Sequence, residues 1–255
     1  MAFVPPQPTF AQGASTTAAV DAGLRSYMLR VYNWMASGLL LTGLTAFAIA
    51  NTSAMDLFYP LAQTANGLRH VSGPLAIPAM LAPLAFVLVL SFGINRLSRT
   101  AVQAIFWAFC IAMGASITSI LFRYTGESIA RTFFVTAGTF AAMSIWGYST
   151  KRDLTGMGNF LVMGLFGIII GSVVNMFIGS SGMQFIISIL GVLIFTGLTA
   201  YDTQRIKSSY YQSASASGMD DTAKRSVYDA LSLYLNFINL FMMLLQLTGN
   251  RSSNS

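Results

Sequence analysis

The sequence predicts an all-α, polytopic membrane protein, a bundle of seven transmembrane helices with the C-terminal helix at its centre. Of the 255 residues, 55% are hydrophobic and only 9% are charged, whereas a soluble domain carries about 25% charged residues. The apolar residues form continuous runs near the roughly 20 residues that cross a bilayer, and they do not alternate as in a membrane β-strand. A polar stripe on the last run indicates that this helix is shielded from lipid.

Seven apolar runs follow one another with short connections. Their approximate spans are 32–50, 74–94, 101–121, 132–148, 158–178, 184–203 and 228–248. The second run contains Pro74, Pro78 and Pro83, so we expect this helix to start late or to kink. Arg131 lies at the start of the fourth run, and this charge makes that run the weakest candidate for a span among the seven.

Residues outside these runs divide the chain into three parts. Residues 1–24 are polar and rich in Pro, Ala and Thr. They lack a basic stretch followed by an apolar run, so they do not resemble a signal peptide, and we expect a disordered tail. Residues 25–250 form the predicted membrane domain, and 251–255 form a short C-terminal tail.

The basic residues predict how the chain is oriented in the bilayer. With the N-terminus inside, ten of the 14 Lys and Arg residues fall in inner segments, namely Arg25, Arg30, Arg96, Arg99, Lys151, Arg152, Arg205, Lys207, Lys224 and Arg225. Four fall outside: Arg69, Arg123, Arg131 and Arg251. This bias predicts a multi-pass protein of the inner (cytoplasmic) membrane with a cytoplasmic N-terminus, an outside C-terminus and a long polar inner connection at 208–224. The same bias accounts for the net charge of +6, so the expected partner is the lipid bilayer and not nucleic acid.

The residue counts exclude several kinds of chemistry. The chain has one His and one Cys, too few for a structural zinc site or an iron–sulfur cluster within one chain. None of its three Lys residues follows a Gly, so a phosphate-binding Gly-Lys loop is absent. We therefore expect no cofactor and no enzymatic activity.

Ionisable groups within membrane spans are costly and are candidate functional residues. Two acids fall there: Asp202 near the end of the sixth run and Asp229 at the start of the seventh. Asp229, Ser232, Asn236 and Asn239 follow a 3–4–3 spacing, which places them on one helix face. Hydrogen-bonded packing between helices explains this stripe as well as a functional site does, and spacing alone does not separate the two interpretations.

Two segments resemble a known family. YDTQRIK at 201–207 and LSLYLNFINLFMMLLQLTG at 231–249 are similar to the C-terminal signature of the transmembrane Bax inhibitor motif family, and VYNWMASGLLLTGLTA at 31–46 resembles the start of its bacterial members. The resemblance covers about residues 25–248. It implies seven helices and a pH-sensitive calcium leak. Eukaryotic members suppress cell death, and some bacterial members are linked to control of a membrane-bound protease.

The resemblance also implies candidate site residues. The family's proposed pH sensor is a pair of aspartates, of which Asp202 matches the first, while Asn236 stands where the second acid is expected. An arginine contacts the pair in the family, and Arg96 is the best match, so we expect Arg96 to bond to Asp202. Two adjacent carboxylates share a proton, but an Asp–Asn pair has no such repulsion, although the amide can donate to the carboxylate.

Three functions remain open. The first is a low-rate leak of Ca²⁺ or another cation gated near Asp202, with weak Ca²⁺ binding there and with Asp229 and Asn239 as secondary candidates. The alternative is a non-conducting regulator that binds another membrane protein. The third is an intramembrane aspartyl protease that uses Asp202 and Asp229, although the GxGD motif of such enzymes is absent.

Overall fold

Long helices make up nearly all of the described chain. The structure, a computed structural model, describes residues 10–64, 67–93, 96–213 and 219–252. Its helices are α1 (Phe10–Ala50), α2 (Met55–Phe58), α3 (Ala76–Gly93), α4 (Arg99–Ile117), α5 (Ile120–Arg123), α6 (Gly126–Ser149), α7 (Thr155–Ile178), α8 (Ser181–Ser213) and α9 (Met219–Thr248). Strands β1 (Leu61–Thr64) and β2 (Gly67–His70) pair antiparallel in the connection between α1 and α3.

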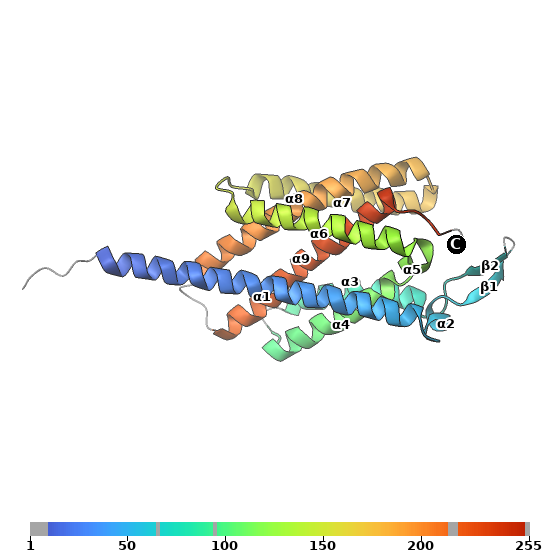
Figure 1. The fold of residues 1–255 in the computed structure, drawn as a ribbon, viewed down its shortest axis with the longest axis horizontal. Coiled ribbons are helices and arrows are strands. Elements are labelled where there is room, and N and C mark those ends of the chain that lie inside the picture. Colours follow the sequence, from blue (N-terminus) through green and yellow to red (C-terminus); the bar gives the residue numbers. More distant parts are fainter. Residues whose placement is uncertain (1–9, 65–66, 94–95, 214–218, 253–255) are drawn as a thin grey trace, which may run out of the picture.

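The seven predicted spans are confirmed. Within the described residues, seven helices are long and apolar enough to cross a membrane: α1, α3, α4, α6, α7, α8 and α9 (Figure 1). Two boundaries need correction. Residues 10–24, expected in a disordered tail, belong to α1, and most of the expected 208–224 loop is helical because α8 runs to Ser213 and α9 begins at Met219. Residues 1–9, 214–218 and 253–255 lie outside the described residues.

Local sequence signals explain several helix ends. Ser98 and Thr125 cap α4 and α6, because each side-chain oxygen accepts a hydrogen bond from the backbone N–H three residues later. Gly179 ends α7 in the left-handed conformation, with φ of 67°. The expected late start of the second span is confirmed, since α3 begins at Ala76, after Pro74.

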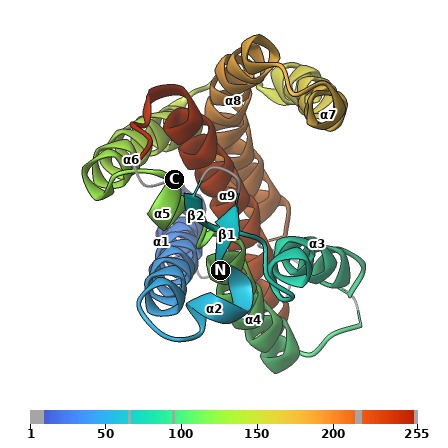
Figure 2. The same cartoon turned by 90° about the vertical axis from the view of Figure 1, so that its right-hand side faces the viewer.

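Helix α9 lies at the centre of the bundle, as predicted. It packs against α1, α4, α6 and α8, and in the end-on view those helices surround it (Figure 2). Helix α7 packs chiefly against α8, and α3 chiefly against α4. This central position stabilises a helix that carries Asp, Asn, Ser and Tyr, because its polar groups contact neighbouring helices and not lipid.

Hydrogen bonds fix α9 against α1 and α4. The hydroxyl of Tyr234 lies 2.7 Å from that of Thr42, which donates to the carbonyl oxygen of Cys110 over 3.0 Å. All three residues are buried, and the Tyr234 ring packs edge-on against Phe109. Because buried polar groups in a membrane need partners inside the protein, this chain of bonds ties three helices together at one depth.

The outer surfaces of α3 and α7 are apolar and face the lipid. Large exposed side chains on these helices include Leu84, Leu88 and Phe92 of α3 and Phe160, Phe166 and Phe177 of α7. In water such surfaces would drive aggregation, whereas hydrocarbon tails solvate them. Both helices lie at the outside of the bundle in Figure 2.

The two ends of the bundle differ in charge. The end at which α8 finishes and α9 begins is called here the α8–α9 end, and the ten basic residues predicted to be inside belong to segments at this end. The hairpin β1–β2 and the C-terminus lie at the opposite end (Figure 1). There the backbone of Arg251 forms an isolated antiparallel β-bridge with that of Tyr124. The first and last described residues lie at opposite ends of the bundle (Figure 1), as an odd number of spans requires.

Candidate functional site

Asp202 lies at a tightly packed point of α8. A Cβ added at Gly147 of α6 would overlap the carbonyl oxygen of Ala200, and one at Gly158 of α7 would overlap the ring of Tyr201. Glycine lets neighbouring helix backbones approach closely within a membrane. These two contacts set α6 and α7 against the residues that immediately precede Asp202, which fixes this part of α8 relative to the bundle.

The carboxylate of Asp202 is buried and fully engaged. The Ser232 hydroxyl and the Asn236 amide donate to Oδ2 over 2.8 and 2.7 Å, and Arg205 donates to Oδ1 over 3.0 Å. The same guanidinium nitrogen of Arg205 donates to Ser232 over 3.1 Å. The four side chains therefore form a closed network between α8 and α9.

The expected contact between Asn236 and Asp202 is confirmed. An ionised carboxylate only accepts hydrogen bonds, so the amide presents Nδ2, its donor, to Asp202. Asn236 and Ser232 lie one turn apart on α9, and both face α8. The polar stripe thus brings two of its members together on Asp202.

The arginine that pairs with Asp202 is Arg205, and the expected pairing with Arg96 is not found. Arg96 lies exposed in the connection between α3 and α4, and it makes no ion pair with a described residue. Arg205 is three residues after Asp202 on the same helix, at a spacing where side chains are neighbours. This spacing could have identified the pair from the sequence. The resemblance to the family indicated Arg96 instead.

The other two members of the stripe do not contact Asp202. Asp229 accepts a hydrogen bond of 2.6 Å from the hydroxyl of Tyr27 on α1, and Asn239 is half-buried without a hydrogen bond to a described residue. Sequence reasoning missed Tyr27, because the two residues are 202 positions apart and no local pattern links them. This bond ties the first span to the last at the α8–α9 end.

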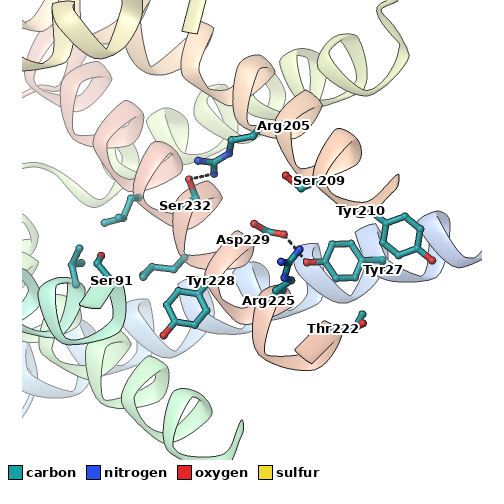
Figure 3. A pocket seen from close by; sticks show the side chains of 13 residues that line it. Tyr27, Ser91, Arg205, Ser209, Tyr210, Thr222, Arg225, Tyr228, Asp229 and Ser232 are labelled. Carbon is teal, nitrogen blue, oxygen red and sulfur yellow. Dashed lines mark hydrogen bonds between the residues drawn. The ribbon is translucent and has the colours of Figure 1, made fainter. Parts of the chain in front are cut away.

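A pocket of about 590 Å³ with a mixed polar and apolar lining opens beside this network. Helices α1, α3, α8 and α9 supply its walls (Figure 3). Arg205 and Ser232 lie at one side of the pocket, Asp229 points toward Tyr27, and Arg225 lies close to them. The side chain of Arg205 is 44% exposed and that of Asp202 is 9% exposed. Arg205 therefore lines the pocket and contacts the buried carboxylate behind it.

The arrangement is not a preformed metal centre. Within the described residues, no group of three or more His, Cys, Asp or Glu side chains lies together. Calcium takes six to eight oxygen ligands, whereas both oxygens of Asp202 here accept from donor groups. A cation at Asp202 would have to compete with Arg205, which already contacts the carboxylate.

Comparison with known sequences identifies the family. The profile described as "Inhibitor of apoptosis-promoting Bax1" matches residues 24–253. An uncharacterized protein of Caulobacter vibrioides is 45% identical over 235 residues, covering 91% of each chain. The inner membrane protein YbhL of Escherichia coli is 44% identical over 231 residues, covering 90% of this chain and 94% of YbhL. An uncharacterized protein of Rickettsia prowazekii is 44% identical over 232 residues, covering 91% of this chain and 92% of that protein.

The matches run through all seven spans and include the segments around Asp202 and Asn236, so the relationship holds for the whole membrane domain and not for a single motif. The chain is therefore a multi-pass integral membrane protein that belongs to the Bax inhibitor-like family.

Proposed function

We propose that this protein is a slow cation leak of the inner membrane, with Ca²⁺ as the first ion to test, and that Asp202 is its gate. The observation that carries the proposal is a buried carboxylate in a membrane-spanning helix, balanced by an arginine that is 44% exposed. Buried acids in membrane spans are costly and mark ion pathways. The inner membrane location draws on the name of the relative YbhL, and the outward C-terminus draws on the distribution of basic residues.

The gate has two states in this proposal. In the proposed closed state, Arg205 holds the place of a cation against Asp202, a role that its 3.0 Å contact with Oδ1 supports. In the open state Arg205 turns into the adjoining pocket, and a cation takes its place. Asp202, Ser232 and the oxygen of Asn236 then supply oxygen ligands, and water completes the shell. One carboxylate gives weak binding, which suits passage more than storage.

Flux through reconstituted protein tests the gate. We expect Ca²⁺ entry into dye-loaded liposomes to exceed that of protein-free liposomes. Asp202→Asn should lower the rate about tenfold, since it removes the only acid of the network, and Arg205→Gln should raise it by freeing the carboxylate. Asp56→Asn is the matched control, because Asp56 is an exposed acid at the opposite end of the bundle.

Wild-type flux equal to that of empty liposomes would overturn the leak and favour the alternative, a non-conducting regulator that binds another membrane protein. Reproducible co-purification of one membrane protein, lost in variants that still fold, would then support the regulator. Unaltered flux in Asp202→Asn would leave a leak but remove Asp202 as its gate.

We also propose that the chain catalyses no reaction. The two carboxylates that an aspartyl protease would need are held by different partners, Asp229 by Tyr27 and Asp202 by the α8–α9 network. Incubation with a fluorogenic transmembrane peptide should therefore give no cleavage. Cleavage that disappears in both Asp202→Ala and Asp229→Ala would contradict this assignment.

A further inference from the structure

The pocket beside Asp202 has a cationic part and an apolar wall. Arg205 and Arg225 contribute charged groups, while Val87 of α3 and Leu231 and Leu235 of α9 contribute apolar ones. Ser91 lies on the α3 side, apart from the two arginines (Figure 3). Its volume of about 590 Å³ falls within the range of about 300–1,000 Å³ typical of ligand sites. A lining divided in this way suits an amphiphile, with a polar group at one end and a hydrocarbon chain at the other.

The apolar wall continues onto the lipid-facing surface. On α3, Leu84, Leu88 and Ser91 lie three to four residues apart and so share a face, and all three are exposed. Val87, which lines the pocket, is their neighbour. Because α3 packs chiefly against α4, this face remains open to the bilayer, and a lipid chain can enter sideways.

The polar end is cationic. The bonds from Arg205 to Asp202 and Ser232 both use one terminal nitrogen of its guanidinium group, so the other three of its five N–H donors lie on the two remaining nitrogens. Arg225 is exposed and makes no ion pair with a described residue. An adjoining pocket of about 360 Å³, which shares Tyr27 with the first, adds Arg30 and Arg99.

These residues lie toward one end of the bundle. Ser91 lies just before the end of α3, Arg205 lies near the end of α8, and Arg225 lies near the start of α9. We therefore expect them on the side where the lipid head groups of one leaflet meet the α8–α9 end. Basic pockets between transmembrane helices bind the head groups of anionic lipids.

We propose that this pocket binds an anionic phospholipid, with its phosphate between Arg205 and Arg225 and one acyl chain along Val87, Leu231 and Leu235. Guanidinium groups bind phosphate oxygens through paired, charge-assisted hydrogen bonds. The acid Asp229 also lines the pocket and keeps its negative charge there. Tyr27 donates to it and holds it toward α1, and the guanidinium groups of Arg205 and Arg225 together outnumber this one negative charge.

Arg205 would contact both the lipid phosphate and Asp202. When Arg205 turns toward a phosphate, it weakens its bond to Asp202, so lipid binding favours release of the carboxylate. Coupling of this kind is reciprocal. Removing the charge of Asp202 should therefore free Arg205 and tighten lipid binding. This consequence is read out by binding and not by ion flux, so it stands or falls independently of the proposed leak.

Lipid affinity of the purified full-length protein tests the proposal. The probe is dioctanoyl phosphatidylglycerol, compared with dioctanoyl phosphatidylcholine and with inorganic phosphate, and the dissociation constant is measured by native mass spectrometry in detergent. We expect preference for phosphatidylglycerol, and about tenfold weaker binding in Arg225→Gln, the equivalent of one charge-assisted contact. Arg152→Gln, an exposed arginine at the same end of the bundle, should bind as the wild type does.

Asp202→Asn should tighten phosphatidylglycerol binding several-fold, provided that its melting temperature shows a folded protein. Equal affinity of the wild type and Arg225→Gln would overturn the site. Inorganic phosphate that competes at the same concentration as phosphatidylglycerol would replace the lipid with a free phosphate and overturn the assignment of the apolar wall. Unchanged binding in a folded Asp202→Asn would overturn the coupling through Arg205.

Discussion

The side-chain amide of Asn236 donates a hydrogen bond of 2.7 Å to the carboxylate of Asp202, across the consecutive helices α8 and α9. The bond stabilises the charged carboxylate without adding a second negative charge. Arg205 supplies the balancing positive charge from the same helix as Asp202. The pair is therefore a single-acid site, which distinguishes it from a carboxylate dyad.

Restoring an acid at position 236 should create pH dependence. Asn236→Asp is nearly isosteric, and it would place two carboxylates in hydrogen-bonding contact, so that they share a proton and titrate as a coupled pair. The charged groups that face this pair are Arg205 and, further along α9, Asp229. We expect wild-type Ca²⁺ flux to vary little between pH 6 and 8 and that of Asn236→Asp to vary steeply, measured in liposomes at matched protein density. Identical pH profiles would show that the pair does not control passage.

Loss of Arg205 should destabilise the protein more than loss of Arg96. Arg205→Ala leaves the buried carboxylate of Asp202 without its positive partner, and the partial exposure of the arginine limits the cost to about 1–2 kcal/mol. Arg96→Ala removes an exposed side chain and should change the free energy of unfolding by less than about 0.5 kcal/mol. Thermal unfolding in detergent compares the two variants. A greater effect of Arg96→Ala would restore Arg96 as the partner.

The Tyr27 hydroxyl should contribute measurably to the attachment of α1. Tyr27→Phe removes the donor to the half-buried Asp229 and should cost about 1.5–3 kcal/mol, the range for a hydrogen bond to a charged group. Tyr32→Phe is the control on the same helix, since the Tyr32 hydroxyl makes no hydrogen bond to a described residue. A double-mutant cycle with Asp229→Asn isolates the pair, and a coupling energy of zero would mean that the bond does not form in the membrane protein.

Two glycines of α6 should respond oppositely to substitution by alanine. Gly147→Ala would press a methyl group against the backbone of Ala200, and we expect a loss of about 1–3 kcal/mol from overpacking. Gly138 has no atom within 4 Å of an added Cβ, so Gly138→Ala should be neutral or stabilising, because alanine favours helix. The melting temperatures of the two variants check this, and equal shifts would contradict the close approach of α6 to α8.

Single cysteines at the two ends of α6 test the orientation of the bundle. Lys151 is exposed at the α8–α9 end and Glu127 is exposed at the other. After replacement of Cys110 by alanine, Lys151→Cys should react with an impermeant maleimide only in inside-out vesicles, and Glu127→Cys only in intact cells or spheroplasts. A reporter after Arg251 should lie outside. The reverse labelling pattern would invert the assignment of inner and outer faces.

The sequence by itself determined the seven spans, because the bilayer allows only uninterrupted helices whose backbone groups bond internally, and such helices are read directly from apolar runs. It also determined that α9 is central, because the 3–4–3 spacing gathers polar groups on one face that lipid would not solvate. The contact between Asn236 and Asp202 was implied by the resemblance to the family and not by the spacing.

The tertiary structure decided which partners those groups find. Arg205 and Arg96 were both arginines on the expected inner side, and only the side-chain positions show that Arg205 holds Asp202. The bond from Tyr27 to Asp229 joins the first and last spans, and the open side of α3 depends on its packing chiefly against α4. Hydropathy determines whether a segment enters the membrane, but not how the segments are turned and placed around one another, because that depends on side-chain packing between helices distant in the sequence.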